Sequence, residues 1–176
     1  GEPVWTDRVL GSLPASLELK ALDETVEVRY EKTASREIRY YRTEPGTIRI
    51  VGNTDDTDGC RKTLLGYLKK YARKTLVPGL YSLARQFGFS VSRVSIRNQK
   101  TRWGSCSAAG SISLNVKVLF LPAELCRYIL IHELCHTKHM NHSKAFWNTV
   151  YRCDPEYKAK DRSMKHAWRY VPPWML

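Results

Sequence analysis

The spacing of apolar residues changes near residue 61, and this change limits how the chain can fold. Before it, Val26, Val28 and Tyr30 alternate with polar neighbours, which is the period of a half-buried β-strand. The stretches REIRYYR and TIRIVG alternate in the same way and flank the turn sequence Glu-Pro-Gly at 44–46, which is typical of a hairpin. We therefore predict a β-meander over residues 25–59.

From residue 61 onward the apolar residues recur at helical spacing. Leu64 and Leu68, with basic residues on the opposite side, predict an amphipathic helix over 61–74. Pro78 is expected to open a second helix that Gly88 closes, because proline suits the first turn of a helix and glycine suits the position after its end.

The remainder of the chain returns to strands and then to helices. Alternating apolar residues predict strands at 94–97 and 112–118, joined by the link 98–110. Pro122 then begins a helical run, and two further helices follow it. Strands and helices that are grouped rather than alternating indicate an α+β fold instead of a doubly wound parallel sheet.

Size and composition limit the class of protein. A chain of 176 residues with 43% hydrophobic content is expected to build one core. It has no run of eighteen apolar residues, so no membrane partner is expected. Its five cysteines are odd in number and contain no CxxC pair, which favours a reducing compartment and hence a cytoplasmic location.

The charge is unevenly distributed. Residues 1–59 hold 8 Lys and Arg against 12 Asp and Glu, which leaves 21 against 5, a net charge of +16, for residues 60–176. Such a charge favours acidic partners: nucleic acid, nucleotides or acidic protein segments. The helix expected at 61–74 carries a run of cations that is either a solvated face or a nucleic-acid contact: Lys62, Lys69, Lys70, Arg73 and Lys74.

Four of the five histidines lie in HELCHTKHMNH at 132–142. His132 and His136 are four residues apart, so a helix presents both on one face, where two imidazoles can bind one metal ion. Glu133 stands beside them, and HExxH is the signature of zinc hydrolases, in which the glutamate acts as general base on a metal-activated water.

The third ligand is expected from His142 rather than His139. In a continuous helix His139 would lie about 10.5 Å along the axis from His132, whereas zinc ligands must be about 3.4 Å apart. Asn141 tolerates the left-handed conformation that ends a helix and turns the chain back, which would bring His142 over the metal. His139 is then a neighbour of the ligands. Three protein ligands leave one open position, as in a catalytic zinc site with one ion per chain.

Several stretches together resemble one known family. They are TRWGSCS at 101–107, SISLN at 111–115, LPAELCRYILIHELCH at 121–136, NHSKAFW at 141–147 and DPEYK at 154–158. In this combination the chain resembles the YgjP-like predicted metal-dependent hydrolases, which are small relatives of the zinc peptidases.

The resemblance implies a minimal zincin-like fold with an active-site helix, a small sheet whose edge faces the cleft, and a third histidine in the next helix. It implies that His132, His136 and His142 bind zinc or a similar transition metal, and that Glu133 is the base. We expect residues 1–24 to be a loosely ordered leader, 25–59 the meander and 60–176 the catalytic domain, with 25–176 as one unit.

Substrate contacts are expected on the two strands before the motif. Arg102 is either a packing residue or a cation at the cleft rim that binds a carboxylate or phosphate. Ser113 and Asn115 share one strand face, where they would hydrogen-bond an extended peptide. His166 is either structural or a group that stabilises an oxyanion.

Three functions follow, in this order. The first is a zinc metallopeptidase acting on proteins or peptides. The second is a metal-dependent nucleotide phosphohydrolase of the pyrophosphatase type, because activated water also attacks phosphorus. The third is a protease recruited to nucleic acid through its basic surface.

Overall fold

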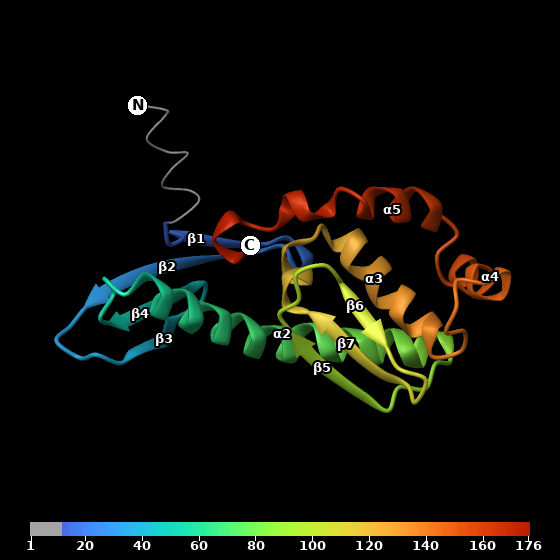
Figure 1. Cartoon of the computed structure of the whole chain (residues 1–176), viewed down its shortest axis with the longest axis horizontal. Helices are drawn as coiled ribbons and strands as arrows, with labels where there is room; N and C mark the ends of the chain where they lie inside the picture. The colour runs from blue at the N-terminus through green and yellow to red at the C-terminus, as the bar shows by residue number, and fades with distance from the viewer. Residues whose placement is uncertain (1–11) are drawn as a thin grey trace.

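The computed structural model describes residues 12–176, and the first eleven residues of the expected leader lie outside that range. One long helix, α2, runs past two small sheets that lie toward its two ends; α3 packs against the second sheet, and α4 and α5 pack against α3 (Figure 1). The fold is therefore α+β, as predicted. The strands are β1 Ser16–Leu19, β2 Glu24–Lys32, β3 Ile38–Glu44, β4 Thr47–Gly52, β5 Arg93–Arg97, β6 Gly104–Cys106 and β7 Ser111–Asn115. The α-helices are α2 Thr57–Phe87, α3 Ala123–His136, α4 Lys144–Cys153 and α5 Tyr157–Met164, and the 3-10 turns are η1 Lys20–Leu22, η2 Val116–Phe120, η3 Ala167–Tyr170 and η4 Pro173–Met175.

The first sheet has the strand order β1-β2-β4-β3. The hairpin between β3 and β4 is confirmed, but β2 pairs with β4 in parallel, so the predicted meander is wrong. Ile48 and Ile50 of β4 are fully buried, whereas β3 is mostly exposed and carries charged side chains. A polar strand suits an edge and an apolar strand suits the centre, which explains why β4 lies between β2 and β3.

The leader prediction also fails from Ser16 onward. Strand β1 pairs antiparallel with β2, and its residues Leu17 and Leu19 are buried in the core. The two leucines alternate with polar residues over only four positions, which is too short for the periodicity to be recognised in the sequence.

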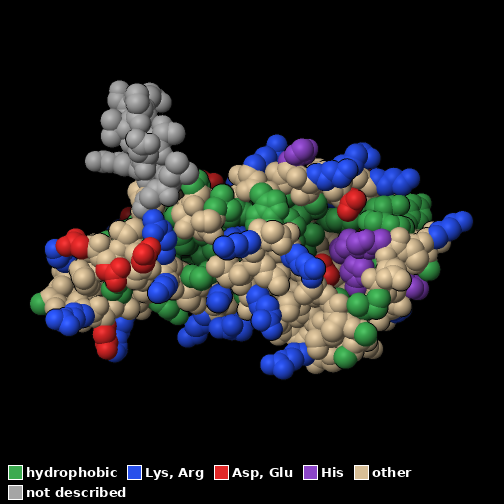
Figure 2. Space-filling model, viewed as in Figure 1, with side chains coloured by type: hydrophobic (Ala, Val, Ile, Leu, Met, Phe, Trp, Pro, Cys, Tyr) green, Lys and Arg blue, Asp and Glu red, His purple; other side chains and the backbone are tan. Residues whose placement is uncertain are grey.

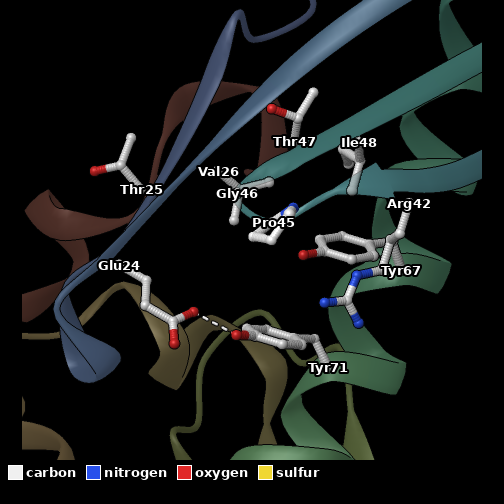
Figure 3. Close-up of a pocket in the computed structure, with 10 residues that line it drawn as sticks. All are labelled: Glu24, Thr25, Val26, Arg42, Pro45, Gly46, Thr47, Ile48, Tyr67 and Tyr71. Carbon is white, nitrogen blue, oxygen red and sulfur yellow. Dashed lines mark hydrogen bonds between the residues drawn. The ribbon is translucent and has the colours of Figure 1, made fainter.

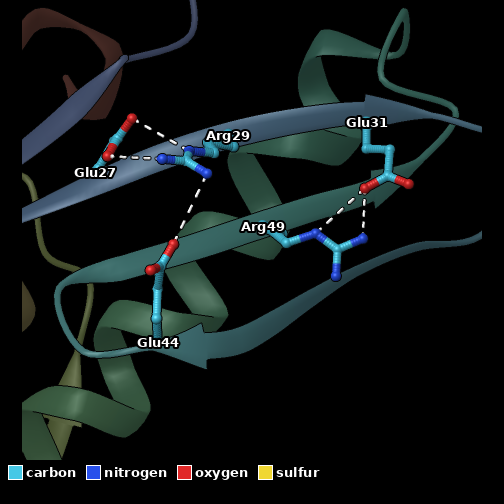
Figure 4. Close-up of polar contacts among 5 residues, drawn as sticks. All are labelled: Glu27, Arg29, Glu31, Glu44 and Arg49. Atoms are coloured by element: carbon cyan, nitrogen blue, oxygen red, sulfur yellow. Dashed lines mark hydrogen bonds and ion pairs between the residues drawn. The ribbon is translucent and has the colours of Figure 1, made fainter.

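One face of the first sheet is solvated. On this face Arg29 lies 3.2 Å from Glu27 and 3.7 Å from Glu44, and Arg49 pairs with Glu31 (Figure 4). Exposed pairs of this kind contribute little stability. On the other face, where α2 packs, Val26 and Val28 of β2 and Ile48 and Ile50 of β4 are buried.

Helix α2 is one helix of 31 residues, so the two helices predicted on either side of Pro78 are a single element. Pro78 lies inside it, at a cost of roughly 3 kcal/mol. A buried stripe continues at every fourth position across the proline, from Leu64 through Leu76 to Leu80. Burial on both sides of Pro78 outweighs the lost hydrogen bond. The helix ends at Gly88 in the left-handed conformation, as predicted.

The second sheet has the order β5-β7-β6. Strands β5 and β7 were predicted and pair in parallel. Strand β6, which pairs antiparallel with β7, lies in the stretch taken as a link. Val116 and Val118, predicted to continue the strand, lie instead in η2 and are fully buried. This sheet and α2 support α3, most of whose residues are buried. None of the helices described at 12–176 is long and apolar enough to cross a membrane.

Candidate metal centre

Helix α3 carries the first two histidines of the site. It begins after Pro122 and is anchored by buried residues that include Leu125, Ile129 and Leu134. His132 and His136 follow Leu125 and Ile129 on the same face of the helix but are only partly buried, and their Nε2 atoms lie 3.3 Å apart. The core therefore holds the backbone of both residues, and the helical spacing sets the distance between their rings.

His142 completes a group of three. Its Nε2 lies 3.1 Å from that of His136, and one nitrogen of each ring lies within 4.8 Å of the others. No other group of three or more His, Cys, Asp or Glu ligand atoms is found among residues 12–176. Histidine side chains gather in one hollow of the surface (Figure 2).

The hydrogen bond that a histidine makes through Nδ1 decides whether its Nε2 carries a proton or presents a lone pair. His136 Nδ1 lies 2.9 Å from the backbone oxygen of His139. A carbonyl only accepts, so Nδ1 carries the proton and Nε2 presents a lone pair. Lone pairs about 3 Å apart repel each other unless a cation lies between them. The separations of 3.1 and 3.3 Å are close to the roughly 3.4 Å between nitrogen ligands of a tetrahedral zinc ion, so the residues fit that metal.

The turn that brings His142 back differs from the prediction in one respect. Helix α3 ends at His136, and His142 lies in the turn before α4, not in the next helix itself. Asn141 is not left-handed, because Asp23 is the one non-glycine residue with positive φ in the described chain. Because α3 already ends at His136, the chain can reverse its direction before His142. His139 lies in this turn and contributes its backbone carbonyl.

Helix α4 packs aromatic rings around the three histidines. Ser143 caps it by accepting a hydrogen bond from the backbone N–H of Phe146. The Phe146 ring stacks on His136 with centroids 4.4 Å apart, and the Trp147 ring lies 5.7 Å from that of His142. These rings restrict the imidazoles to their converging orientation and exclude water from one side of the centre.

Tyr128 and Asp161 form a second support that the sequence reasoning missed. The Tyr128 hydroxyl donates to Asp161 Oδ1 at 2.8 Å, and its oxygen lies 3.5 Å from His132 Nδ1. The His132 ring therefore has its Nδ1 proton directed at Tyr128, so Nε2 is free for a metal. Such outer partners fix the tautomer of ligand histidines. Tyr128 precedes His132 by four residues, a helical spacing that signals this contact.

Burial controls the protonation of the two helix histidines. It lowers the pKa of His132 to about 3, with further lowering by His136 and His142. It also lowers the pKa of His136. Both imidazoles are therefore neutral near pH 7, which is the form that binds metals.

Glu133 is buried beside the histidines. Burial raises the pKa of its carboxyl to about 7, and the charge of Arg102 acts in the opposite direction. A methyl group on Gly104 of β6 would lie 3.0 Å from Glu133 Cγ, so the glycine leaves room for the carboxylate. Glu133 is not one of the three converging groups, and its pKa suits a proton acceptor at neutral pH.

The expected substrate residues take different positions. Arg102 is exposed and close enough to influence Glu133. Asn115 is fully buried, and its Nδ2 donates to the backbone oxygens of Gln99 and Arg102 at 2.9 and 2.8 Å. It therefore fixes the loop that carries Arg102 and is not available to a peptide, which corrects the prediction. Ser113 lies on the central strand β7, and its hydroxyl hydrogen-bonds that of Ser95 on β5 at 3.0 Å.

Lys117 and His166 lie outside the group of three histidines. Lys117 is buried, and its Nζ donates to the Gln99 backbone oxygen at 2.7 Å, in support of the same loop. His166 is exposed at the residue before η3 and makes none of the ring contacts of the three histidines.

Comparison with known proteins identifies one family and several distant structures. A family profile described as "YgjP-like, metallopeptidase domain" matches residues 13–167. No protein with a curated description matches the chain.

Among solved structures, the metallopeptidase zymogen abylysin of Pyrococcus abyssi is 35% identical over 49% of this chain and 90% of that chain, with a TM-score of 0.44. The zymogen jannalysin of Methanocaldococcus jannaschii is 23% identical over 52% and 93%, with a TM-score of 0.44. Wss1 from Saccharomyces cerevisiae is 15% identical over 78% and 93%, with a TM-score of 0.37. These TM-scores are too low to argue for a shared fold.

Proposed function

This chain belongs to the YgjP-like metallopeptidase family, and from that membership we propose that it is a zinc peptidase with His132, His136 and His142 as ligands and Glu133 as general base. Membership makes the chain a metal-dependent hydrolase of peptide bonds. The choice of zinc, the number of ions and the role of each residue are our proposal. The observation that carries it is the convergence of three imidazole nitrogens whose lone pairs point at one position.

The proposed chemistry divides between the ion and the protein. A zinc ion held by His132, His136 and His142 would act as a Lewis acid that lowers the pKa of water toward 7. Glu133 accepts a proton at its carboxylate and donates it to the leaving amine. Its burial disfavours the charged form, and Arg102 offsets part of that penalty. The carboxylate is thus able both to accept and to release a proton near pH 7.

Strand β6 is the proposed platform for the peptide. It is an outer strand of its sheet, and a Cβ atom added to its Gly104 would lie 3.0 Å from Glu133 Cγ. An extended peptide that pairs with a sheet edge is held by main-chain hydrogen bonds, so unfolded segments are the expected substrates. Arg102, exposed near Glu133, supplies a cation for an acidic group of the substrate. These features support a minimal zincin-like arrangement of helix, edge strand and third histidine.

Nucleotide hydrolysis is the second candidate, and the site favours it less. Phosphoryl hydrolases that use two metal ions need several carboxylates to hold them. The ligand group found in the described residues consists of three histidines and no carboxylate. The observation that still favours nucleotide hydrolysis is the net charge of +16 on residues 60–176, which attracts polyphosphates.

We also propose a cytoplasmic location. The five cysteines are all free, and four of them are buried. Unpaired thiols are usual in reducing compartments.

The direct test is the variant Glu133→Gln. We expect it to retain one zinc ion per chain, measured by mass spectrometry of the metal, and to cut an unfolded protein substrate about 10²- to 10⁴-fold more slowly, because the base is lost. The wild-type protein is assayed in parallel with nucleoside triphosphates for phosphate release. Full peptidase activity of Glu133→Gln would contradict the role of Glu133. Phosphate release without peptide cleavage would favour the second candidate.

A further inference from the structure

Helix α2 carries a group of cations without acidic partners. They are Lys62, Lys69, Lys70, Arg73 and Lys74, and none of them forms an ion pair within residues 12–176. Like charges three or four residues apart destabilise a helix by about 0.2–0.5 kcal/mol for each pair. Lys and Arg side chains gather along the part of the surface where α2 runs (Figures 1 and 2). A bound polyanion would remove this repulsion.

A groove between α2 and β3 lies beside these cations. It holds a hollow of about 280 Å³ whose lining includes Arg42, Lys70 and Lys74. A second hollow of about 400 Å³, whose lining is drawn in Figure 3, shares Arg42, Tyr67 and Tyr71 with the first. Because of these shared residues the two hollows form one groove.

Aromatic rings form the floor of this groove. The rings of Tyr67 and Tyr71 stack with centroids 5.8 Å apart, and Tyr40 meets Tyr67 edge to face at 5.4 Å. The Arg42 guanidinium lies 6.0 Å from the centre of the Tyr71 ring. Glu24 accepts a hydrogen bond from the Tyr71 hydroxyl (Figure 3). This carboxylate makes the second hollow unfavourable for phosphate, so phosphates belong with the lysines.

We propose that the groove between α2 and β3 binds single-stranded nucleic acid. Arg42, Lys70 and Lys74 contact phosphates, and the partly exposed rings of Tyr40 and Tyr71 offer apolar surface to the bases. Tyr67 is buried and packs against both rings. An acidic peptide would use the cations but not the rings, whereas cations combined with aromatic rings are what single-stranded nucleic acid requires. The proposal is independent of the metal centre.

The length of the cationic surface sets the expected salt dependence. Lys62 and Lys74 are twelve residues apart, about 18 Å along a helix, which is the length of about five nucleotides in a strand stacked at 3.4 Å per nucleotide, as in a duplex. Each phosphate contact to a single strand lowers the slope of log K against log salt by about 0.7. Four to five contacts therefore give a slope of about −3.

The test uses the full-length zinc-loaded protein and a fluorescent twenty-residue oligothymidine, measured by anisotropy from about 50 to 200 mM salt. The variant reverses Arg42, Lys70 and Lys74 to Glu. We expect its Kd to rise at least tenfold and its salt slope to become less negative by about 2, as three lost contacts require. A matched control reverses Lys144 in α4, Lys158 in α5 and Lys165 just after α5. It changes the net charge by the same amount and should weaken binding much less.

A second variant tests the aromatic floor. Tyr71→Leu removes one ring and is expected to weaken single-strand binding about tenfold, with unchanged cleavage of a short peptide as the check on folding. Equal loss of binding in the two charge-reversed variants would overturn the proposal, as would equal affinity for a duplex of the same length. Absence of binding near 150 mM salt would also overturn it.

Discussion

Gly104→Ala tests how closely β6 approaches Glu133, the proposed general base. The Cβ atom added by this change would lie 3.0 Å from Glu133 Cγ, 3.1 Å from Glu133 Oε2 and 3.0 Å from the backbone oxygen of Ser113. Gly104 does not have a positive φ, so alanine causes no backbone strain of its own. The cost of the substitution therefore comes from the contacts alone.

The magnitude follows from which neighbour can move. Carbon atoms in contact prefer separations of about 3.5–4.0 Å, so something must shift by roughly 0.5 Å. Ser113 lies in the central strand β7, paired with β5 and β6, and cannot yield easily. Glu133 must move instead. Overpacking of this kind costs about 1–3 kcal/mol of folding free energy, and displacement of a catalytic group by up to about 1 Å costs up to 10²-fold in rate.

We therefore expect Gly104→Ala to lower the free energy of unfolding in urea by about 1–3 kcal/mol and kcat by ten- to a hundredfold. The zinc content should not change, because the histidines are untouched. Gly66→Ala is the matched control: Gly66 lies inside α2 with no atom within 4 Å of the added Cβ. It should stabilise the protein by about 0.5–1 kcal/mol and leave kcat unaltered. Wild-type stability and kcat in Gly104→Ala would refute the reasoning.

Three further predictions concern the metal centre. His142→Ala should abolish zinc binding measured by chelator competition, whereas His139→Ala should retain it because this residue contributes a backbone carbonyl; the opposite result would exclude the proposed ligand set. Tyr128→Phe keeps the ring but removes the hydrogen bond toward His132, and should weaken zinc affinity about 10–100-fold; an unchanged Kd would show that Tyr128 is structural. In the metal-free protein, the lowered pKa of His132 contributes stability above pH 6.5 that is lost as the pH falls toward 3. The slope should be up to about 1.4 kcal/mol per pH unit, and a urea midpoint that stays constant over this range would contradict it.

The local pattern of the sequence predicts most elements and the centre of the site. The i, i+4 spacing of His132 and His136 fixes their shared helix face whatever the rest of the fold. The argument from helix length favours His142 over His139, and the ring nitrogens of His142 and the two helix histidines do lie close together. Strands with at least five alternating residues were found for the same reason. Such features depend on short-range geometry that the sequence contains directly.

The failures involve competition between distant segments. The order of the first sheet depends on whether β3 or β4 is the more apolar partner for β2, which no single segment reveals. Pro78 has a local cost that burial elsewhere along α2 overcomes. Asp161 supports the site from α5, 33 positions after Tyr128. The Asn115 side chain has the hydrogen-bonding groups that could contact a peptide. Only its burial in the structure shows that it instead holds the loop that carries Arg102.

The boundary expected at residue 59 divides the sequence by charge and periodicity but does not divide the core. The N-terminal half of α2 lies against β3 and β4, where Tyr67 meets Tyr40. Leu64 and Leu68, on the same half, are fully buried. If the first sheet were absent, exposing these two leucines would cost roughly 3–6 kcal/mol, a large part of the 5–15 kcal/mol that stabilises a typical domain. The other half of α2 packs against β5 and α3. Because α3 carries His132 and His136, destabilising α2 would also destabilise the metal centre. We infer that the first sheet and the peptidase site fold as one unit.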